Sequence, residues 1–319
     1  MSGIPTSSAL FHYIGNFDII IQIGSSQEDM FVTERTKAII MLIIASILWS
    51  TGGLLIKMVD WNPVAISGSR SFIAGMVIFV YLKKPKITMS RPQVVGAIAY
   101  ASTVSLFVMA NKLTTSPNAI LLQYTAPAFV AVLGVWLLKE KIHWFDLVSI
   151  LFVLGGMVIF FSDSSGQGNS LGNAIAVASG FFLAVVTVAL RFQKEGSPVE
   201  TMLLGNFLTF IVAIPFIFGG LPDLKSIMVI ILLGVVQLGI SYILYGLALK
   251  HVTALEAVLI TVIEPLLNPF WVFTVVGEKP TFLSLLGGIV VLLGVVGRNI
   301  AFVRHTARLK KTASAVMPQ

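Results

Sequence analysis

Long apolar runs of about 20 residues dominate the sequence, and proline, glycine, asparagine or charged residues separate them. A hydrocarbon core about 30 Å thick requires roughly 20 apolar residues per helix, so each run is long enough to span it. Across the chain 56% of the residues are hydrophobic and 11% are charged, whereas about a quarter are charged in an average soluble domain. The strands of a membrane β-barrel would be about half as long and would alternate in polarity. We therefore expect an all-α membrane protein.

Ten of these runs are expected to be transmembrane helices. Their predicted bounds are 38–58, 64–82, 93–111, 117–138, 144–162, 171–191, 199–219, 226–249, 254–275 and 281–303. Three of them follow Asn62-Pro63, Ser116-Pro117 or Ser197-Pro198, where the start of a helix tolerates the missing proline N–H. Residues 1–33 contain only a short apolar stretch without a preceding basic region, so we expect a flexible or mis-assigned extension there.

The basic residues gather in alternate connections between the runs. The residues that fall on one side are Arg35, Lys37, Lys83, Lys84, Lys86, Arg91, Lys139, Lys141, Arg191, Lys194, Lys250, Arg298, Arg304, Arg308, Lys310 and Lys311. The other side has only Lys112, Lys225 and Lys279, with Lys57 and Arg70 near span ends. Because cytoplasmic connections carry the excess of lysine and arginine, we expect both termini to be cytoplasmic, with residues 304–319 as a basic cytoplasmic tail. The expected location is the cytoplasmic membrane.

The second half of the chain repeats the first. A shift of 138 positions aligns Pro127 with Pro265, Glu140-Lys141 with Glu278-Lys279, Lys112 with Lys250, and Thr115 with Thr253. Matches among apolar residues would mean little in such a sequence, but matched prolines and Glu-Lys pairs do not follow from composition. The predicted repeats are residues 34–165 and 166–303. With five helices each, the repeats must enter the membrane in opposite directions, which is the inverted-repeat plan of secondary transporters.

The repeated segments also carry a family resemblance. The run from Lys112 through Tyr124-Thr125-Ala126-Pro127 to Lys141, with its counterpart ending in Glu264-Pro265 and Gly277-Glu278-Lys279, resembles the EamA branch of the drug/metabolite transporter superfamily. Trp49 and Arg70 also look like the family pattern, although Ser50-Thr51-Gly52-Gly53 replaces the commoner Gly-Ser run after the tryptophan. The resemblance implies a ten-helix fold with a central cavity. It also implies transport of amino acids, sugars, nucleotide-related metabolites or xenobiotics.

Glu264 lies near the middle of the ninth predicted span, between Thr261 and Asn268. A charge at the centre of a bilayer costs about 2.5–3.5 kcal/mol on insertion scales, so this side chain should face protein or water. It is a candidate for solute binding or proton coupling, with Asn268 beside it, and the alternative is a neutral structural acid. Pro265 frees the carbonyl of Thr261, and Pro127 frees that of Gln123 in the other repeat. Both prolines are candidates for hinge and cavity backbone, or for simple kinks.

Several other side chains are candidates for the lining of a solute pathway. Gln123, Tyr124 and Tyr245 offer hydrogen bonds and aromatic surface, and Trp49 could pack against a solute. The aromatic residues could instead belong to the interfacial belt. Arg70 could attract a carboxylate or phosphate, or extend toward the headgroups as long basic side chains do. Tyr242, Gln237, Asn206 and Asn111 are candidates of lower weight, and Glu256 is expected to cap a helix or face water.

Together these features predict a secondary transporter that moves a small metabolite, such as an amino acid or drug-like solute, by alternating access, with export as the expected direction. Its expected partners are the solute, the lipid bilayer and a proton as a candidate coupling ion, and nucleic acid is not among them. The sequence contains no His-Glu-x-x-His pattern, no Gly-x-Ser-x-Gly elbow, no phosphate-binding glycine loop and no cysteine. We therefore expect neither an enzyme nor a metal or other cofactor. A channel and a non-transporting membrane scaffold are the alternatives.

Overall fold

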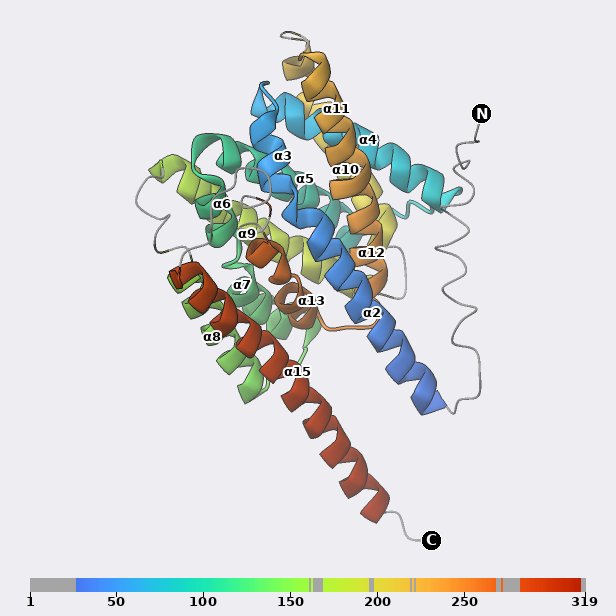
Figure 1. Cartoon of the computed structure of the whole chain (residues 1–319). Helices are drawn as coiled ribbons and strands as arrows, with labels where there is room; N and C mark the ends of the chain where they lie inside the picture. Colours follow the sequence, from blue (N-terminus) through green and yellow to red (C-terminus); the bar gives the residue numbers. More distant parts are fainter. Residues whose placement is uncertain are drawn as a thin grey trace, which may run out of the picture.

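The computed structural model describes residues 27–160, 162, 169–194, 198–218, 220, 222–267, 271 and 282–316, which form helices and turns without any strand (Figure 1). The elements in chain order are α2 (Gln27–Ser50), α3 (Gly52–Met58), α4 (Pro63–Leu82), α5 (Arg91–Leu113), α6 (Ser116–Gln123), α7 (Ala126–Leu133), η2 (Gly134–Leu138), α8 (Trp144–Phe160), α9 (Ser170–Phe192), α10 (Pro198–Ile217), α11 (Leu224–Leu232), η4 (Leu233–Ile240), α12 (Ser241–Ala248), α13 (Ala254–Ile260) and α15 (Phe282–Val316). The two η elements are π-helical. The expected all-α class is confirmed for the described residues.

Seven stretches within the described residues are helical, long and apolar enough to cross a membrane. They are Glu34–Met58, Pro63–Leu82, Arg91–Leu113, Ser170–Phe192, Pro198–Ile217, Leu224–Ala248 and Leu285–His305. Each coincides with one of the ten predicted spans. Of the other three, 144–162 corresponds to the 17-residue α8, 117–138 is a broken helix, and 254–275 extends beyond the described residues. The chain is thus a multi-span membrane protein, and the total of ten spans stays a prediction.

The fourth and ninth predicted spans are both interrupted just before their prolines. α6 ends at Gln123 and a turn precedes α7, whereas α13 ends at Ile260 and a turn precedes the helical residues 263–267. The cause is local, because a proline cannot donate the backbone hydrogen bond that would continue the helix. The beginnings of the two spans also match. Thr115 Oγ1 accepts the N–H of Asn118 at 3.3 Å, and Thr253 Oγ1 accepts the N–H of Glu256 at 3.2 Å.

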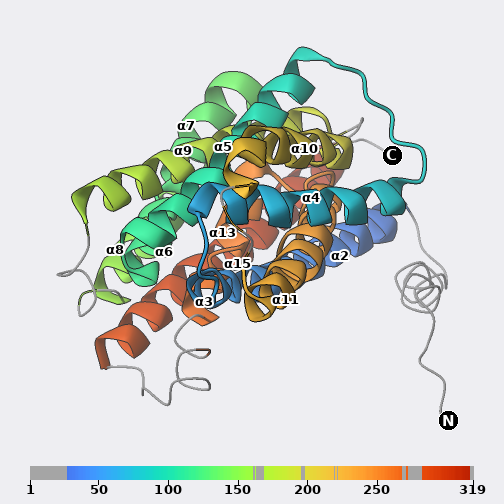
Figure 2. The ribbon, with the colours of Figure 1, turned by 90° about the horizontal axis from the view of Figure 1, so that it is seen from above.

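α13 forms the centre of the bundle. Its residues Ala254–Ile260 are all buried, and the view from above shows it surrounded by longer helices (Figure 2). α8 and α15 pack side by side (Figure 1), and a Cβ on Gly156 would lie only 2.9 Å from the carbonyl oxygen of Gly287. Large apolar side chains such as Trp136 and Phe282 point outward and are about three-quarters exposed, at 75% and 76%. In a bilayer these outer surfaces contact lipid.

Two boundaries differ from the prediction. α2 begins at Gln27, so the first helix starts inside the predicted extension 1–33, and α15 continues to Val316, through most of the predicted tail 304–319. The start of α2 and the end of α15 lie at the same end of the bundle (Figure 1), where Arg35 donates to Asn299 Oδ1 at 3.4 Å. The start of the first described helix and the end of the last one therefore share one side of the bundle, and the cytoplasmic location of the termini stays a prediction.

Four buried or partly buried charged residues meet at this end of the bundle, and we call them the ion-pair cluster: Arg35, Asp146, Glu256 and Arg298. Arg298 Nε lies 2.9 Å from Asp146 Oδ1, and Arg298 Nη1 lies 3.4 Å from Glu256 Oε2. Arg35 pairs with Glu256 Oε1, and the guanidinium groups of both arginines lie over the ring of Phe302. Of the two expectations for Glu256, exposure to water was wrong, because the residue is 1% exposed and forms two ion pairs, whereas its place in the first turn of α13 agrees with a position at a helix start.

A separate ion pair lies at the connection after η2. Arg191 Nε, at the end of α9, lies 3.0 Å from Glu140 Oε1. The other carboxylate oxygen of Glu140 accepts the N–H of Ala254, the first residue of α13, at 3.3 Å. Glu140 thus joins three segments that are distant in the sequence.

Candidate functional site

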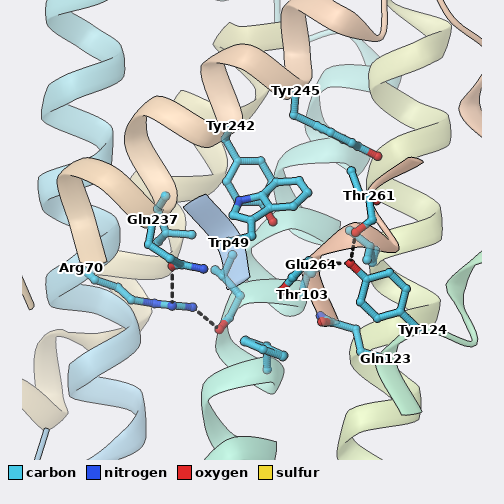
Figure 3. Close-up of a pocket in the computed structure, with 14 residues that line it drawn as sticks. Trp49, Arg70, Thr103, Gln123, Tyr124, Gln237, Tyr242, Tyr245, Thr261 and Glu264 are labelled. Atoms are coloured by element: carbon cyan, nitrogen blue, oxygen red, sulfur yellow. Dashed lines mark hydrogen bonds between the residues drawn. The ribbon is translucent and has the colours of Figure 1, made fainter. Parts of the chain in front are cut away.

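A buried cavity lies between the two halves of the chain, next to the breaks in the fourth and ninth predicted spans (Figure 3). Its free volume is about 40 Å³. Residues of α2, α4, α5, α6, α9, η4 and α12 line it, together with residues that follow α6 and α13. The full lining is Trp49, Arg70, Thr103, Val104, Phe107, Gln123, Tyr124, Leu183, Gln237, Leu238, Tyr242, Tyr245, Thr261 and Glu264.

Arg70 occupies one end of the cavity. Its side chain is 1% exposed, its Nη1 donates to Gln237 Oε1 at 3.2 Å, and its Nη2 donates to the carbonyl of Val104 at 3.0 Å (Figure 3). The alternative in which Arg70 extends toward the headgroups does not fit this position. Its Nε–H has no partner, and among the described residues no carboxylate forms an ion pair with it.

Small residues allow this arrangement to form. A Cβ on Gly234 would lie 2.8 Å from the carbonyl oxygen of Arg70, so the glycine permits η4 to pack directly against α4. A Cβ on Gly52 would lie 2.8 Å from Gln237 Nε2, so this glycine makes room for the amide that accepts from Arg70. The wider winding of η4 carries Gln237 toward the cavity, and π-helical turns frequently occur at functional sites.

Glu264 and Tyr124 occupy the other side of the cavity. The Tyr124 hydroxyl lies 2.7 Å from Glu264 Oε2 and 2.7 Å from the carbonyl oxygen of Thr261 (Figure 3). Thr261 is the residue whose carbonyl loses its helical partner at Pro265. That oxygen instead accepts the N–H of Glu264 at 2.9 Å and the Tyr124 hydroxyl. Tyr124 thereby joins the break in the fourth predicted span to the break in the ninth.

The two short contacts of Tyr124 restrict where protons can lie. A hydroxyl has one hydrogen, so Tyr124 can donate either to Thr261 or to Glu264, but not to both. Both contacts are hydrogen bonds only where Glu264 is protonated and donates to the Tyr124 oxygen while Tyr124 donates to Thr261. An ionised Glu264 would instead accept from Tyr124 and release the carbonyl of Thr261. The charge of Glu264 thus determines which atoms the tyrosine holds together.

An aromatic wall separates these two ends. The ring of Trp49 lies 4.8 Å from that of Tyr242 and 5.1 Å from that of Tyr245, measured between centroids. The hydroxyl of Tyr245 bonds Thr187 Oγ1 at 2.8 Å, whereas the indole Nε1–H of Trp49 has no partner. All three side chains are buried within the protein, which places them away from an interfacial belt. Together they offer a mainly apolar aromatic surface, on which the indole N–H of Trp49 is a buried donor without a partner.

The remaining candidates have different surroundings. Gln123 lines the cavity and donates to Ser179 Oγ at 2.8 Å, and its carbonyl lies against α9, where a Cβ on Gly180 would lie 2.5 Å away. Pro127 is buried in the first turn of α7. Pro265 is also buried, whereas Asn268 lies outside the described residues.

Two of the polar candidates of lower weight lie outside the cavity lining. Asn206 donates to the Tyr100 hydroxyl at 2.9 Å, and Asn111 donates to the carbonyl of Phe107 within its own helix at 3.0 Å. Conversely, the sequence analysis did not select Thr103, which lines the cavity from α5. Its position on a long apolar helix gave no signal, because a lone threonine in a span usually bonds its own helix, as Thr103 does with Ala99 at 2.8 Å.

The fold and the cavity define a class of protein: a multi-span helical membrane protein with a polar cavity in its centre. The profile of the EamA-like transporter family matches residues 36–162 and again residues 170–299. The chain therefore belongs to the EamA-like transporter family, and it is a membrane transporter.

Individual relatives agree with this assignment. An uncharacterized transporter of Clostridium kluyveri is 23% identical over 304 residues, which cover 87% of this chain and 97% of the relative. An uncharacterized transporter of Synechocystis is 24% identical over 220 residues, which cover 64% of this chain and 63% of the relative. A solved structure described only as the crystal structure of a protein superposes with a TM-score of 0.72 at 18% identity, covering 85% of this chain and 99% of that one. This last likeness concerns the fold.

Proposed function

We propose that the protein is a secondary carrier that moves a small metabolite across the cytoplasmic membrane by alternating access, with export as the net direction. The observation that carries this proposal is the central cavity, which has a guanidinium at one end, a carboxyl group at the other and an aromatic wall between them. Such a cavity suits a small polar or amphipathic solute, with amino acids as the first candidates. A channel or a scaffold would not require these three features together.

The size of the cavity supports a carrier rather than an open channel. A buried water needs roughly 10–15 Å³ of free volume, so about 40 Å³ holds about three water molecules. A metabolite therefore enters only when side chains or helices move. The breaks before Pro127 and Pro265 lie next to the cavity and offer positions at which the two spans can bend. Pro127 and Pro265 are accordingly proposed as hinges, and the two segments 34–165 and 166–303 as inverted repeats.

The ion-pair cluster supports the same mechanism, because two of its three pairs, Arg35–Glu256 and Asp146–Arg298, join one proposed repeat to the other. Arg35 and Asp146 belong to the first, and their partners Glu256 and Arg298 belong to the second. A shift of 138 positions places Asn118 opposite Glu256, so the matching position in the first repeat has no charge. We propose that the cluster closes the cytoplasmic end of the pathway and must separate when that end opens.

Glu264 is the proposed coupling residue. It is buried beside the cavity, and its protonation determines whether Tyr124 also holds Thr261, as the single hydroxyl hydrogen requires. Exchange of a proton for the solute would therefore alter a contact between the two broken spans. Gln123, Tyr124, Trp49, Tyr245 and Arg70 are proposed as solute-facing residues, and Asn268 retains that proposal from sequence alone.

Reconstitution into liposomes tests the proposed function. Uptake of labelled amino acids and nucleosides should saturate with concentration, and a preloaded unlabelled solute should drive counterflow of the labelled one. A linear, non-saturating flux would indicate a channel, and the absence of any flux across the whole panel would indicate a scaffold. Either result would contradict the carrier.

The coupling role has a sharper test within the same assay. Glu264→Gln keeps the size and hydrogen-bonding capacity of the side chain but removes its titration, whereas Glu264→Asp retains titration on a shorter stem. We expect Glu264→Gln to abolish accumulation driven by a proton gradient and to retain solute exchange. If it transports like the parent between pH 5 and 8, Glu264 is a structural acid and leaves the proposed site. Equal loss of both reactions would assign it to solute binding.

A further inference from the structure

We propose that the Arg70 end of the cavity is a receptor for an anionic oxygen group, so that the transported solute carries a carboxylate or a phosphate. The inference rests on the proposed function, since it assumes that this cavity is the solute site. It narrows the solute from small metabolites in general to acids, including zwitterions, and it assigns the atoms that would bind the acid group.

Arg70 carries a buried positive charge that no carboxylate of the described residues compensates. Arg70 is 1% exposed, and within the described part of the chain no carboxylate pairs with it. The contrast with the ion-pair cluster is direct, because buried Arg298 has both Asp146 and Glu256 within ion-pair distance. Removing an ion from water costs several kcal/mol even after the protein relaxes. A buried guanidinium held only by neutral acceptors thus leaves that cost largely uncompensated, and an anionic ligand would offset it.

Two hydrogen-bond donors of the cavity-lining residues also lack partners. Nη1 and Nη2 of Arg70 are held by the amide oxygen of Gln237 and the carbonyl of Val104, which fixes the guanidinium plane. The Nε–H has no partner, and neither does the indole N–H of Trp49, a residue that lines the same cavity. Buried donors without partners are uncommon in folded proteins. Two of them around one cavity, beside an uncompensated positive charge, are the donors that an anionic oxygen group would use.

The rest of the cavity restricts the remainder of the solute. The rings of Trp49, Tyr242 and Tyr245 offer an apolar surface next to the anion receptor, and Glu264 adds a carboxyl group on the other side (Figure 3). An acid with an apolar body fits the anion receptor and the aromatic surface. An amino group opposite the acid group would fit the carboxyl group of Glu264. A simple organic cation would leave Arg70 and both free donors without partners.

The test compares matched pairs of compounds that differ in the acid group. L-Leucine and L-leucinamide form the carboxylate pair, and glucose 6-phosphate and glucose form the phosphate pair. Binding is measured as the rise in Tm of the purified full-length protein, and transport as competition in the liposome assay. We expect one acid to bind about tenfold or more tightly than its neutral counterpart, as the loss of charge-assisted hydrogen bonds predicts. At roughly one hundred times its Kd, that acid should raise Tm by about 5 °C.

Variants assign the preference to the proposed atoms. Arg70→Gln should abolish the preference for the acid, and Trp49→Phe should weaken acid binding about threefold to tenfold while retaining an aromatic ring. Lys225→Gln removes an exposed basic residue outside the cavity and should leave the preference unchanged. If Arg70→Gln fails to fold, two measurements still test the receptor: the compound pairs on the parent protein, and acid binding by Trp49→Phe.

Two binding results with the parent protein contradict the receptor: neutral compounds that bind as tightly as their acids, or chloride alone raising Tm as much as the acids do. Two variant results contradict it as well: Arg70→Gln still binding acids more tightly than neutral compounds, or Trp49→Phe binding the acids like the parent. The pair that responds distinguishes a carboxylate from a phosphate. Failure of the proposed function looks different, because acids would then raise Tm in an Arg70-dependent manner although no solute crosses the liposome membrane.

Discussion

The contact between Tyr124 and Glu264 leads to a quantitative prediction about stability. Tyr124→Phe removes one hydroxyl, which lies 2.7 Å from both Glu264 Oε2 and the carbonyl of Thr261. The Thr261 carbonyl keeps the N–H of Glu264 at 2.9 Å, so it still has a partner. The Glu264 carboxyl group, which is 8% exposed, loses the side chain that bonds it. The single substitution therefore leaves a buried polar group without a partner.

The size of the effect follows from that group. An unsatisfied buried acceptor or donor costs about 1–3 kcal/mol, so Tyr124→Phe should lower the free energy of unfolding by about 2 kcal/mol. Glu264→Met removes the carboxyl group and leaves the Tyr124 hydroxyl with Thr261 as its acceptor. In the double variant neither polar group remains, and replacing both partners by apolar groups is nearly neutral. We therefore expect the double variant to be about 1–2 kcal/mol more stable than the sum of the single effects.

Equilibrium unfolding in detergent micelles, followed by tryptophan fluorescence, measures the free energy of unfolding of the parent, Tyr124→Phe, Glu264→Met and the double variant. Tyr100→Phe is the matched control, because its hydroxyl accepts from Asn206 rather than contacting Glu264. Its effect should add to that of Glu264→Met within about 0.5 kcal/mol. If the effects of Tyr124→Phe and Glu264→Met also add within about 0.5 kcal/mol, the Tyr124 hydroxyl and the Glu264 carboxyl group are not coupled. That result would refute the link between the two broken spans.

Three further predictions concern topology, hinges and closure. Reporter fusions after Lys86 should register as cytoplasmic and those after Gly168 as external, and a cytoplasmic signal at the latter would contradict ten spans. Pro127→Ala or Pro265→Ala should reduce turnover in liposomes with little loss of folded protein, because each restores a backbone N–H that straightens a hinge. Unchanged transport kinetics in both variants would show that the two prolines serve packing alone. Arg298→Met should destabilise the protein by about 3–5 kcal/mol by leaving buried carboxylates unpaired, and a Tm equal to that of the parent would exclude the ion-pair cluster.

Local features of the sequence predicted the breaks in two spans and most of the cavity lining. Pro127 and Pro265 lack the N–H that would continue the preceding helix, and turns at residues 124–125 and 261–262 precede them. Polar or aromatic residues within apolar runs are costly in lipid, which is why they tend to face one another inside a bundle. Eight of the residues chosen on this ground, among the 14 that line the cavity, surround it together: Trp49, Arg70, Gln123, Tyr124, Gln237, Tyr242, Tyr245 and Glu264.

Features that depend on packing between distant segments could not be predicted from these patterns. Counting along the second predicted span, 64–82, placed Arg70 near its end, whereas the close approach of η4 at Gly234 encloses this residue. Gln237 had low weight because nothing in its neighbourhood predicts a π-helical turn. The ion pair between Arg35 and Glu256 joins residues 221 positions apart, and no local pattern identifies such partners.

The ion-pair cluster also constrains how the protein is made. Arg35 precedes Glu256 by 221 residues, and Asp146 precedes Arg298 by 152. At about 5–20 residues per second, translation takes roughly 10–45 s to supply the partner of Arg35. During that interval the arginine is a hydrated charge, available on the proposed topology to hold the first helix in its orientation. The same residue then enters the cluster, which becomes complete only when the last helix delivers Arg298. A nascent chain arrested before that point would lack Arg298 and therefore the partner of Asp146.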